Sequence, residues 1–255
     1  MIGGYTNMSN LVKLRLNSKK PILCVPCEGE TVGDICFRCE DIMKKPHDII
    51  EFKAGSFAGL PNLSQLWNAI LMIQSVTNEE PVIFSCDIKK LPEYYQTSRD
   101  YYDILSFAIR CGLCDALEIE STTDMDTVED LCDQCDDTGL IPIVTFHLDS
   151  PSDADDLLEK MEAFTDIDSL NAFHIICPVT STDEIHMLQQ KAQEFMNDNF
   201  GYRVIIEPTG AIAKEELKKG NTFSSPIVYA EVDGETDEMA SCEEISAILK
   251  GKTEK

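Results

Sequence analysis

The chain has 255 residues, of which 43% are hydrophobic, and its formal net charge is -25. This length and apolar content suit one substantial core, so we expect a single main domain. The negative charge repels phosphate backbones and anionic headgroups, which excludes nucleic acid and membrane surfaces as expected partners. The first residues are polar and no run approaches the roughly 20 apolar residues of a membrane span, so we expect a cytoplasmic protein.

The predicted elements alternate strictly along the chain. Met1–Lys20 is predicted to be an N-terminal extension, in which Leu11–Leu16 alternates apolar and basic residues as a short strand would. Amphipathic stretches with helical spacing, such as Leu63–Val76, Tyr101–Arg110 and Thr182–Met196, then separate short apolar runs. The apolar runs are Ile22–Cys27, Asp48–Lys53, Pro81–Asp87, Ala116–Ser121, Ile141–His147, Asn171–Pro178, Tyr202–Pro208 and Ser225–Val232.

Strand–helix alternation repeated eight times is typical of an α/β protein with the (β/α)8 TIM-barrel fold. We therefore predict one such barrel over residues 21–250, after the extension at 1–20 and before a disordered tail at 251–255. In this fold the C-terminal ends of the strands carry the functional side chains. The irregular stretch Ile88–Ser98 follows the third strand and is expected to fold over that end.

Eleven cysteines include four C-x-x-C pairs, a pattern that in other settings indicates zinc or thiol redox chemistry. Cys36 and Cys39 continue a helical apolar stripe, and so do Cys132 and Cys135. Because such stripes leave no loop to close around an ion, we interpret these cysteines as small core residues. Their abundance then fits a reducing compartment, without structural disulfides.

Polar side chains follow several of the predicted strands at their C-terminal ends. Residues two apart share a face of a strand, so each pair is expected to point the same way. If these faces point to the barrel axis, the side chains converge into one acidic pocket with a lysine and a histidine; otherwise some lie at the solvated rim or pair with loops. The pairs are Glu51 and Lys53, Ser85 and Asp87, Glu118 and Glu120, and Thr145 and His147.

Five segments resemble the type I 3-dehydroquinate dehydratases in order and spacing. They are Ile22–Pro26, Asp48–Gly55, Tyr101–Ser121, Ile143–His147 and His174–Pro178, within a match from Pro21 to Val232. The resemblance implies a TIM barrel of the shikimate pathway that uses no cofactor and forms a homodimer. It also implies a lysine that forms a Schiff base with the substrate ketone, and a histidine that acts as acid and base.

Residue by residue, the resemblance assigns some of these roles. His147 matches the acid/base histidine, and Glu51 matches the acidic residue of the second strand. Glu118 and Glu120 match the acidic pair of the fourth strand, whereas Lys53 stands where the family has an arginine. Lys53 keeps the charge but loses the bidentate fork of arginine.

Other positions depart from the family pattern. Phe173 occupies the position of the Schiff-base lysine, with its ring expected to face the cavity and His174 expected to face the helices. Asp87 replaces an arginine, Lys214 corresponds to another, and a Ser-Ala-Pro-Gly-Gln segment near the eighth strand has no counterpart. A phenyl ring cannot form an imine, so we expect the dehydratase activity to be lost.

Three readings of function follow from this pattern. The first is a barrel without dehydratase activity that binds a small polyol or carboxylate metabolite or has a regulatory role. The second is an active lyase in which His147 is the acid/base and the electrophile is Lys53 or a divalent metal held by the acidic residues. The third is an intact dehydratase whose lysine lies elsewhere in the chain.

Overall fold

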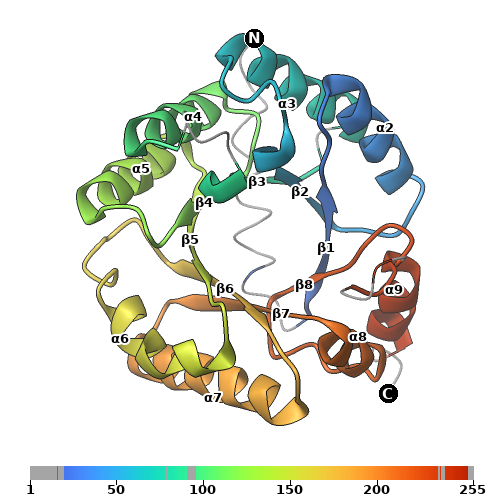
Figure 1. Cartoon of the computed structure of the whole chain (residues 1–255), viewed down its shortest axis with the longest axis vertical. Coiled ribbons are helices and arrows are strands. Elements are labelled where there is room, and N and C mark those ends of the chain that lie inside the picture. The colour runs from blue at the N-terminus through green and yellow to red at the C-terminus, as the bar shows by residue number, and fades with distance from the viewer. Residues whose placement is uncertain are drawn as a thin grey trace.

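The computed structural model describes residues 16, 20–78, 80–90, 96–234, 236 and 239–251. Residues 11–15 of the predicted strand Leu11–Leu16, nearly all of the extension at 1–20, and the tail beyond Gly251 lie outside these residues. The described residues form a sheet of eight parallel strands in the order β7-β6-β5-β4-β3-β2-β1-β8, and β8 also adjoins β7. Figure 1 shows the strands around a central axis with the helices outside them, so the predicted TIM barrel is confirmed.

The strands lie within or close to the predicted apolar runs. β1 and β5 have the predicted bounds, whereas β8 is much shorter than its run. The strands are β1 (Ile22–Cys27), β2 (Ile49–Lys53), β3 (Val82–Ser85), β4 (Ala116–Glu120), β5 (Ile141–His147), β6 (Ala172–Pro178), β7 (Arg203–Thr209) and β8 (Ile227–Tyr229).

Helices follow the strands and pack on the outside of the barrel (Figure 1). They are α2 (Val32–Ile42), α3 (Leu63–Thr77), α4 (Ser98–Cys111), α5 (Met125–Thr138), α6 (Leu157–Glu162), α7 (Thr182–Asp198), α8 (Ala211–Lys218) and α9 (Cys242–Gly251), with short 3₁₀ turns η2 (Ala54–Ser56), η3 (Ile88–Lys90) and η5 (Pro151–Asp156). Among the described residues, none of the helices combines the length and the apolar character needed to cross a bilayer.

The connection from β1 to α2 is held by a capping box. The Thr31 hydroxyl accepts a hydrogen bond from the Asp34 backbone N–H (3.2 Å), and the Asp34 carboxylate accepts one from the Thr31 N–H (3.0 Å). Gly29 packs so closely that a Cβ there would lie 2.8 Å from the Ile35 nitrogen. A side chain at residue 29 would therefore push α2 away from the end of β1.

The apolar residues form two layers because side chains alternate across each strand. The larger layer lies between the strands and the helices and includes Leu23, Phe52, Phe84 and Phe173. The smaller layer fills the barrel axis with Ile, Ala and Cys side chains from alternate strand positions, and it includes Tyr229 of β8. Above this inner layer, at the C-terminal ends of the strands, the interior is polar, and that polar layer is the candidate site.

The orientation of β6 is opposite to the sequence prediction. Phe173 faces the helices, where its ring stacks on Tyr202 (centroids 5.5 Å apart) and meets Phe195 edge to face (5.3 Å). His174 instead lies inside the barrel and is fully buried, stacked on the Tyr229 ring at 5.1 Å. The segment AFHIICP is apolar on both sides of His174, so its pattern did not select a face, and a shift of one residue exchanges the two faces.

Candidate functional site

A cleft opens at the C-terminal ends of β2 to β6. Its volume is about 440 Å³, which includes open solvent at its mouth. Seven of the eight strand-end residues expected to converge do so here, together with Lys90 from η3 and Ile176 from β6. The eighth, Thr145, is buried and donates a hydrogen bond of 3.2 Å to Glu118 Oε2. The lining residues are Glu51, Lys53, Gly55, Ser85, Cys86, Asp87, Lys90, Glu118, Glu120, His147 and Ile176.

Glu51 lies deep in this cleft and is only 2% exposed. Its Oε1 accepts a hydrogen bond of 2.6 Å from the Ser85 hydroxyl, and its Oε2 lies 3.6 Å from Lys53 Nζ. Burial and the nearby carboxylates of Glu118 and Glu207 raise the pKa of Glu51 to about 7, although Lys53 opposes the shift. Glu51 therefore changes its charge near neutral pH.

Lys53 brings an amine into the cleft from the end of β2. Burial by itself would lower the pKa of this ammonium, but Glu51, Glu207 and Glu118 outweigh it and hold the pKa above its usual value. Lys53 is consequently protonated at neutral pH. A protonated amine has no lone pair with which to attack a carbonyl carbon.

Two histidines occupy different depths. His147 is at the rim, where its Nε2 lies 3.1 Å from Glu120 Oε1, and this contact raises the imidazole pKa. His174 is deeper: Nδ1 is 2.9 Å from Glu118 Oε1, and Nε2 is 3.1 Å from Glu207 Oε2. Burial would lower the pKa of His174, but the two carboxylates raise it to about 10.

The deep layer contains polar atoms without a hydrogen-bond partner. Glu51 Oε2, Glu207 Oε2, Tyr229 Oη and His174 Nε2 are all buried in this state. The His174–Glu207 contact is thus an ion pair whose atoms are not aligned for a hydrogen bond. Buried polar atoms of this kind are unfavourable unless water or a ligand completes them.

The sequence prediction missed Glu207, Tyr229 and the inward position of His174. Glu207 interrupts an apolar run two residues after the interior Ile205, and that alternation could have revealed it. Tyr229 ends β8 and has no comparable signal, because a tyrosine in a strand suits either face. The inward orientation of His174 depends on the register of β6, in which His174 is paired with Thr145 of β5.

Comparison with known proteins places this barrel in a family. The profile of the type I 3-dehydroquinases matches residues 23–253. The chain is 23% identical over 230 residues to a 3-dehydroquinate dehydratase from Klebsiella pneumoniae subsp. pneumoniae, which covers 89% of this chain and 91% of that protein. It is 22% identical to one from Lactiplantibacillus plantarum, which covers 88% and 90%.

The chain belongs to the type I 3-dehydroquinase family. Solved structures agree on the fold: a type I 3-dehydroquinate dehydratase from Clostridium difficile, solved with covalently modified comenic acid, matches with a TM-score of 0.79 and 16% identity over 93% of this chain and 94% of that chain. A 3-dehydroquinate dehydratase from Geobacillus kaustophilus matches with a TM-score of 0.79 and 14% identity over 93% of both chains.

In this type I 3-dehydroquinase barrel, β6 offers no amine to the interior. Ala172, His174 and Ile176 are its inward positions. The expectation that Phe173 faces the cavity is therefore wrong, but the residue that does face it, His174, also lacks a primary amine. A histidine between two carboxylates can hold or move a proton and cannot form an imine.

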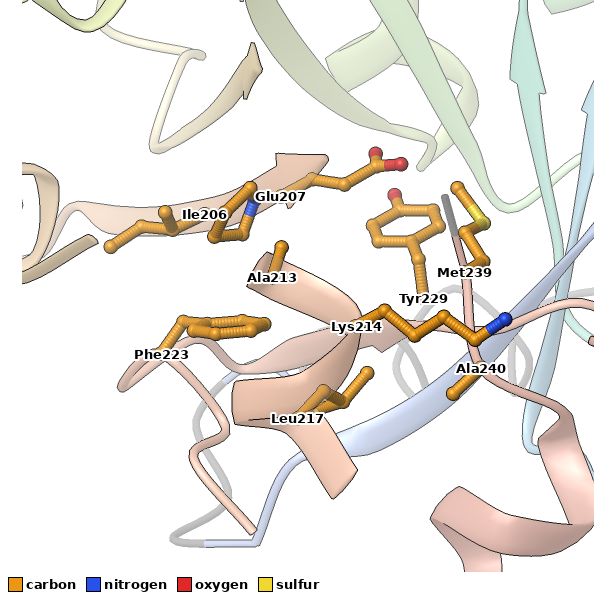
Figure 2. A pocket seen from close by; sticks show the side chains of 10 residues that line it. Ile206, Glu207, Ala213, Lys214, Leu217, Phe223, Tyr229, Met239 and Ala240 are labelled. Atoms are coloured by element: carbon orange, nitrogen blue, oxygen red, sulfur yellow. The ribbon is translucent and has the colours of Figure 1, made fainter. Parts of the chain in front are cut away.

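Lys214 does not join the cleft. It lines a second cavity of about 320 Å³, including open space, between β7, α8 and residues 239–240 (Figure 2). Its Nζ donates hydrogen bonds to the carbonyl oxygens of Gly234 (3.2 Å) and Thr236 (2.5 Å), so the ammonium holds the chain after β8. In Figure 2 the Glu207 carboxylate and the Tyr229 hydroxyl lie at the other side of this cavity.

The remaining predicted residues are also placed. Asp87 lies at the rim, where one of its carboxylate oxygens accepts a hydrogen bond of 2.9 Å from the Lys89 N–H.

Within the described ranges, His, Cys, Asp and Glu form no group of three or more that could hold a metal ion. The divalent-metal alternative therefore gains no support from these residues.

Proposed function

We propose that this member of the type I 3-dehydroquinase family has lost the dehydratase reaction and binds a small polyhydroxylated metabolite in the acidic cleft. One observation carries the proposal: the inward face of β6 presents His174, clamped between Glu118 and Glu207, and no amine. Imine chemistry requires a neutral primary amine next to the substrate ketone. The loss of activity thus rests on His174 rather than on Phe173.

The charge of the cleft supports an uncharged ligand over a carboxylate. Glu51, Asp87, Glu118 and Glu120 line the cleft, and the lysines there are Lys53 and Lys90. Lys53 already pairs with Glu51, and Lys90 Nζ lies 3.8 Å from Glu28. A ligand carboxylate would therefore be repelled by the carboxylates of the cleft, because both lysines already pair with glutamates of the protein. The hydroxyl groups of a neutral ligand can instead donate hydrogen bonds to these carboxylates.

The second candidate is an active lyase in which Lys53 supplies the imine nitrogen and His147 moves the proton. It is favoured by the presence of both residues in one cleft. It is opposed by the raised pKa of Lys53, which keeps the amine protonated. We rank it second for that reason.

Incubation with 3-dehydroquinate tests both candidates. The enone product is followed by its absorbance, and borohydride treatment before mass spectrometry traps any imine. We expect neither turnover nor an adduct. An adduct on Lys53 that disappears in Lys53→Arg would establish the second candidate, and turnover without an adduct would establish a different electrophile.

Binding is tested by calorimetric titration with a neutral cyclohexane polyol and, separately, with quinate. We expect heat from the neutral polyol and none from the carboxylate, and we expect Glu118→Gln to weaken the binding. Tighter binding of quinate would contradict the charge argument.

We further propose that the protein forms a homodimer, on the basis of the family resemblance. We also propose a cytoplasmic location, since all eleven cysteines are free thiols.

A further inference from the structure

Two cysteines from different C-x-x-C pairs meet in the outer core. Cys27 is the last residue of β1 and Cys39 lies in α2, with their Sγ atoms 3.4 Å apart. Both side chains are fully buried, and Cys27 Sγ also lies 3.8 Å from the Ile35 carbonyl oxygen. The tertiary fold thus pairs sulfurs that the spacing of the motifs does not pair.

The backbone around the two sulfurs is fastened on both sides. The Thr31–Asp34 capping box fixes the first turn of α2, and the tight packing of Gly29 sets the distance from β1 to α2. A disulfide bond is about 2.05 Å long, so the sulfurs need to approach by about 1.4 Å from their present separation. Because the backbone is held on both sides, rotation of the two side chains has to supply most of this approach.

We propose that Cys27 and Cys39 form a reversible thiol–disulfide pair that responds to low-molecular-weight disulfides such as oxidised glutathione. The Cys39 thiolate attacks one sulfur of the oxidant, forms a mixed disulfide and expels one thiolate. Cys27 then attacks Cys39 Sγ and expels the second thiolate. Two protein thiols are oxidised, one small disulfide is reduced to two thiols, and the two protein protons pass to those thiols.

The order of attack follows from the contact between the two thiols. The Cys27 thiol lies against Cys39 Sγ, and a thiol that donates to the Cys39 sulfur stabilises its thiolate and lowers the pKa of Cys39. Burial instead raises the pKa of Cys132 to about 12, as it does for other cysteines inside the protein. Cys39 is therefore the sulfur best suited to begin the exchange once α2 opens enough to admit the oxidant.

The pair is linked to the cleft through Glu28 and Lys90. Glu28 follows Cys27, accepts a hydrogen bond of 3.0 Å from the Ser56 hydroxyl and lies 3.8 Å from Lys90 Nζ. Lys90 lines the cleft. A bond from Cys27 to Cys39 would anchor the strand end that carries Glu28, so oxidation would stiffen this side of the cleft.

Oxidation of the full-length, reduced protein by oxidised glutathione tests the proposal. We expect the intact mass to fall by about 2 Da as two thiol hydrogens are lost. Peptide mapping after alkylation should show the segment containing Cys27 linked to the one containing Cys39. Hydrogen exchange of the amides in residues 28–39 should slow on oxidation and recover on reduction.

The variants sharpen this test. Cys27→Ser and Cys39→Ser should each abolish the linkage, and the matched core variant Cys132→Ser should retain it. Linkage between any other pair, stable glutathione addition to half-buried Cys36, or a linkage that forms only after denaturation would each overturn the proposal. The peptide map of the unmodified chain decides the question even if a serine variant does not fold.

Discussion

Adjacent residues of β6 occupy opposite environments. Phe173 lies in an aromatic cluster with Phe195 and Tyr202, where its contribution is packing. His174 lies between Glu118 and Glu207, where its contribution is charge. One strand thus divides an apolar outer layer from a charged interior, and the chemistry of this barrel depends on which residue points which way.

The largest expected effect is from a lysine at the outer position. Phe173→Lys would put an ammonium among aromatic rings, and we expect it to lower the free energy of unfolding by about 5 kcal/mol or more. Urea unfolding measures this, with Phe173→Leu as the control, expected to lose only about 1–2 kcal/mol. A stable Phe173→Lys protein that gains a borohydride-trapped adduct would place residue 173 in the cavity instead.

Removal of the buried cation should be nearly as costly. His174→Leu leaves Glu118 and Glu207 close together without their partner, and we expect a loss of about 3–5 kcal/mol in the free energy of unfolding. His174→Lys keeps a cation at the inner position and should lose less. Equal losses in the two variants would show that packing on Tyr229, rather than charge, is what His174 provides.

The same histidine predicts a pH dependence. Its pKa is about 10 in the folded protein, above the usual value near 6.5, so its stabilisation is complete below pH 6.5. As the pH rises from 6.5 to 10, the unfolded chain holds fewer protons than the folded one. We therefore expect a loss on the order of 3 kcal/mol over that range.

Chemical denaturation at several pH values measures this loss, and His174→Gln should flatten it. A free energy of unfolding that stays constant from pH 6.5 to 10 in the unmodified protein would show that His174 is neutral inside the barrel.

At pH 5 the smallest effect is expected at Glu51. Its folded pKa of about 7 exceeds the unfolded value, so the unfolded chain loses this proton first and stability falls between about pH 4.5 and 7. Glu51→Gln mimics the protonated form and still accepts from Ser85, so we expect a change within about 1 kcal/mol at pH 5. Above pH 7 the variant should be the more stable protein, and the reverse order would contradict a raised pKa.

Much of the barrel was predictable because its strands and helices follow local periodicity. Ile22–Cys27 and Ile141–His147 have their predicted bounds, and the alternation of Glu51 with Lys53 correctly placed both in one cleft. Lys214 was predicted from the family resemblance to bind substrate, but its ammonium binds the carbonyls of Gly234 and Thr236, which no local pattern could indicate.

By itself, the sequence determined the strand–helix order, the single barrel and the acidic end of the strands, since these depend on residue types and spacings within each segment. Only the tertiary structure decided which face of β6 is inside, that Glu207 and Tyr229 complete the interior, and that Cys27 meets Cys39. The physical reason is register: an apolar strand such as β6 satisfies either face locally, and only its pairing with β5 and β7 selects one.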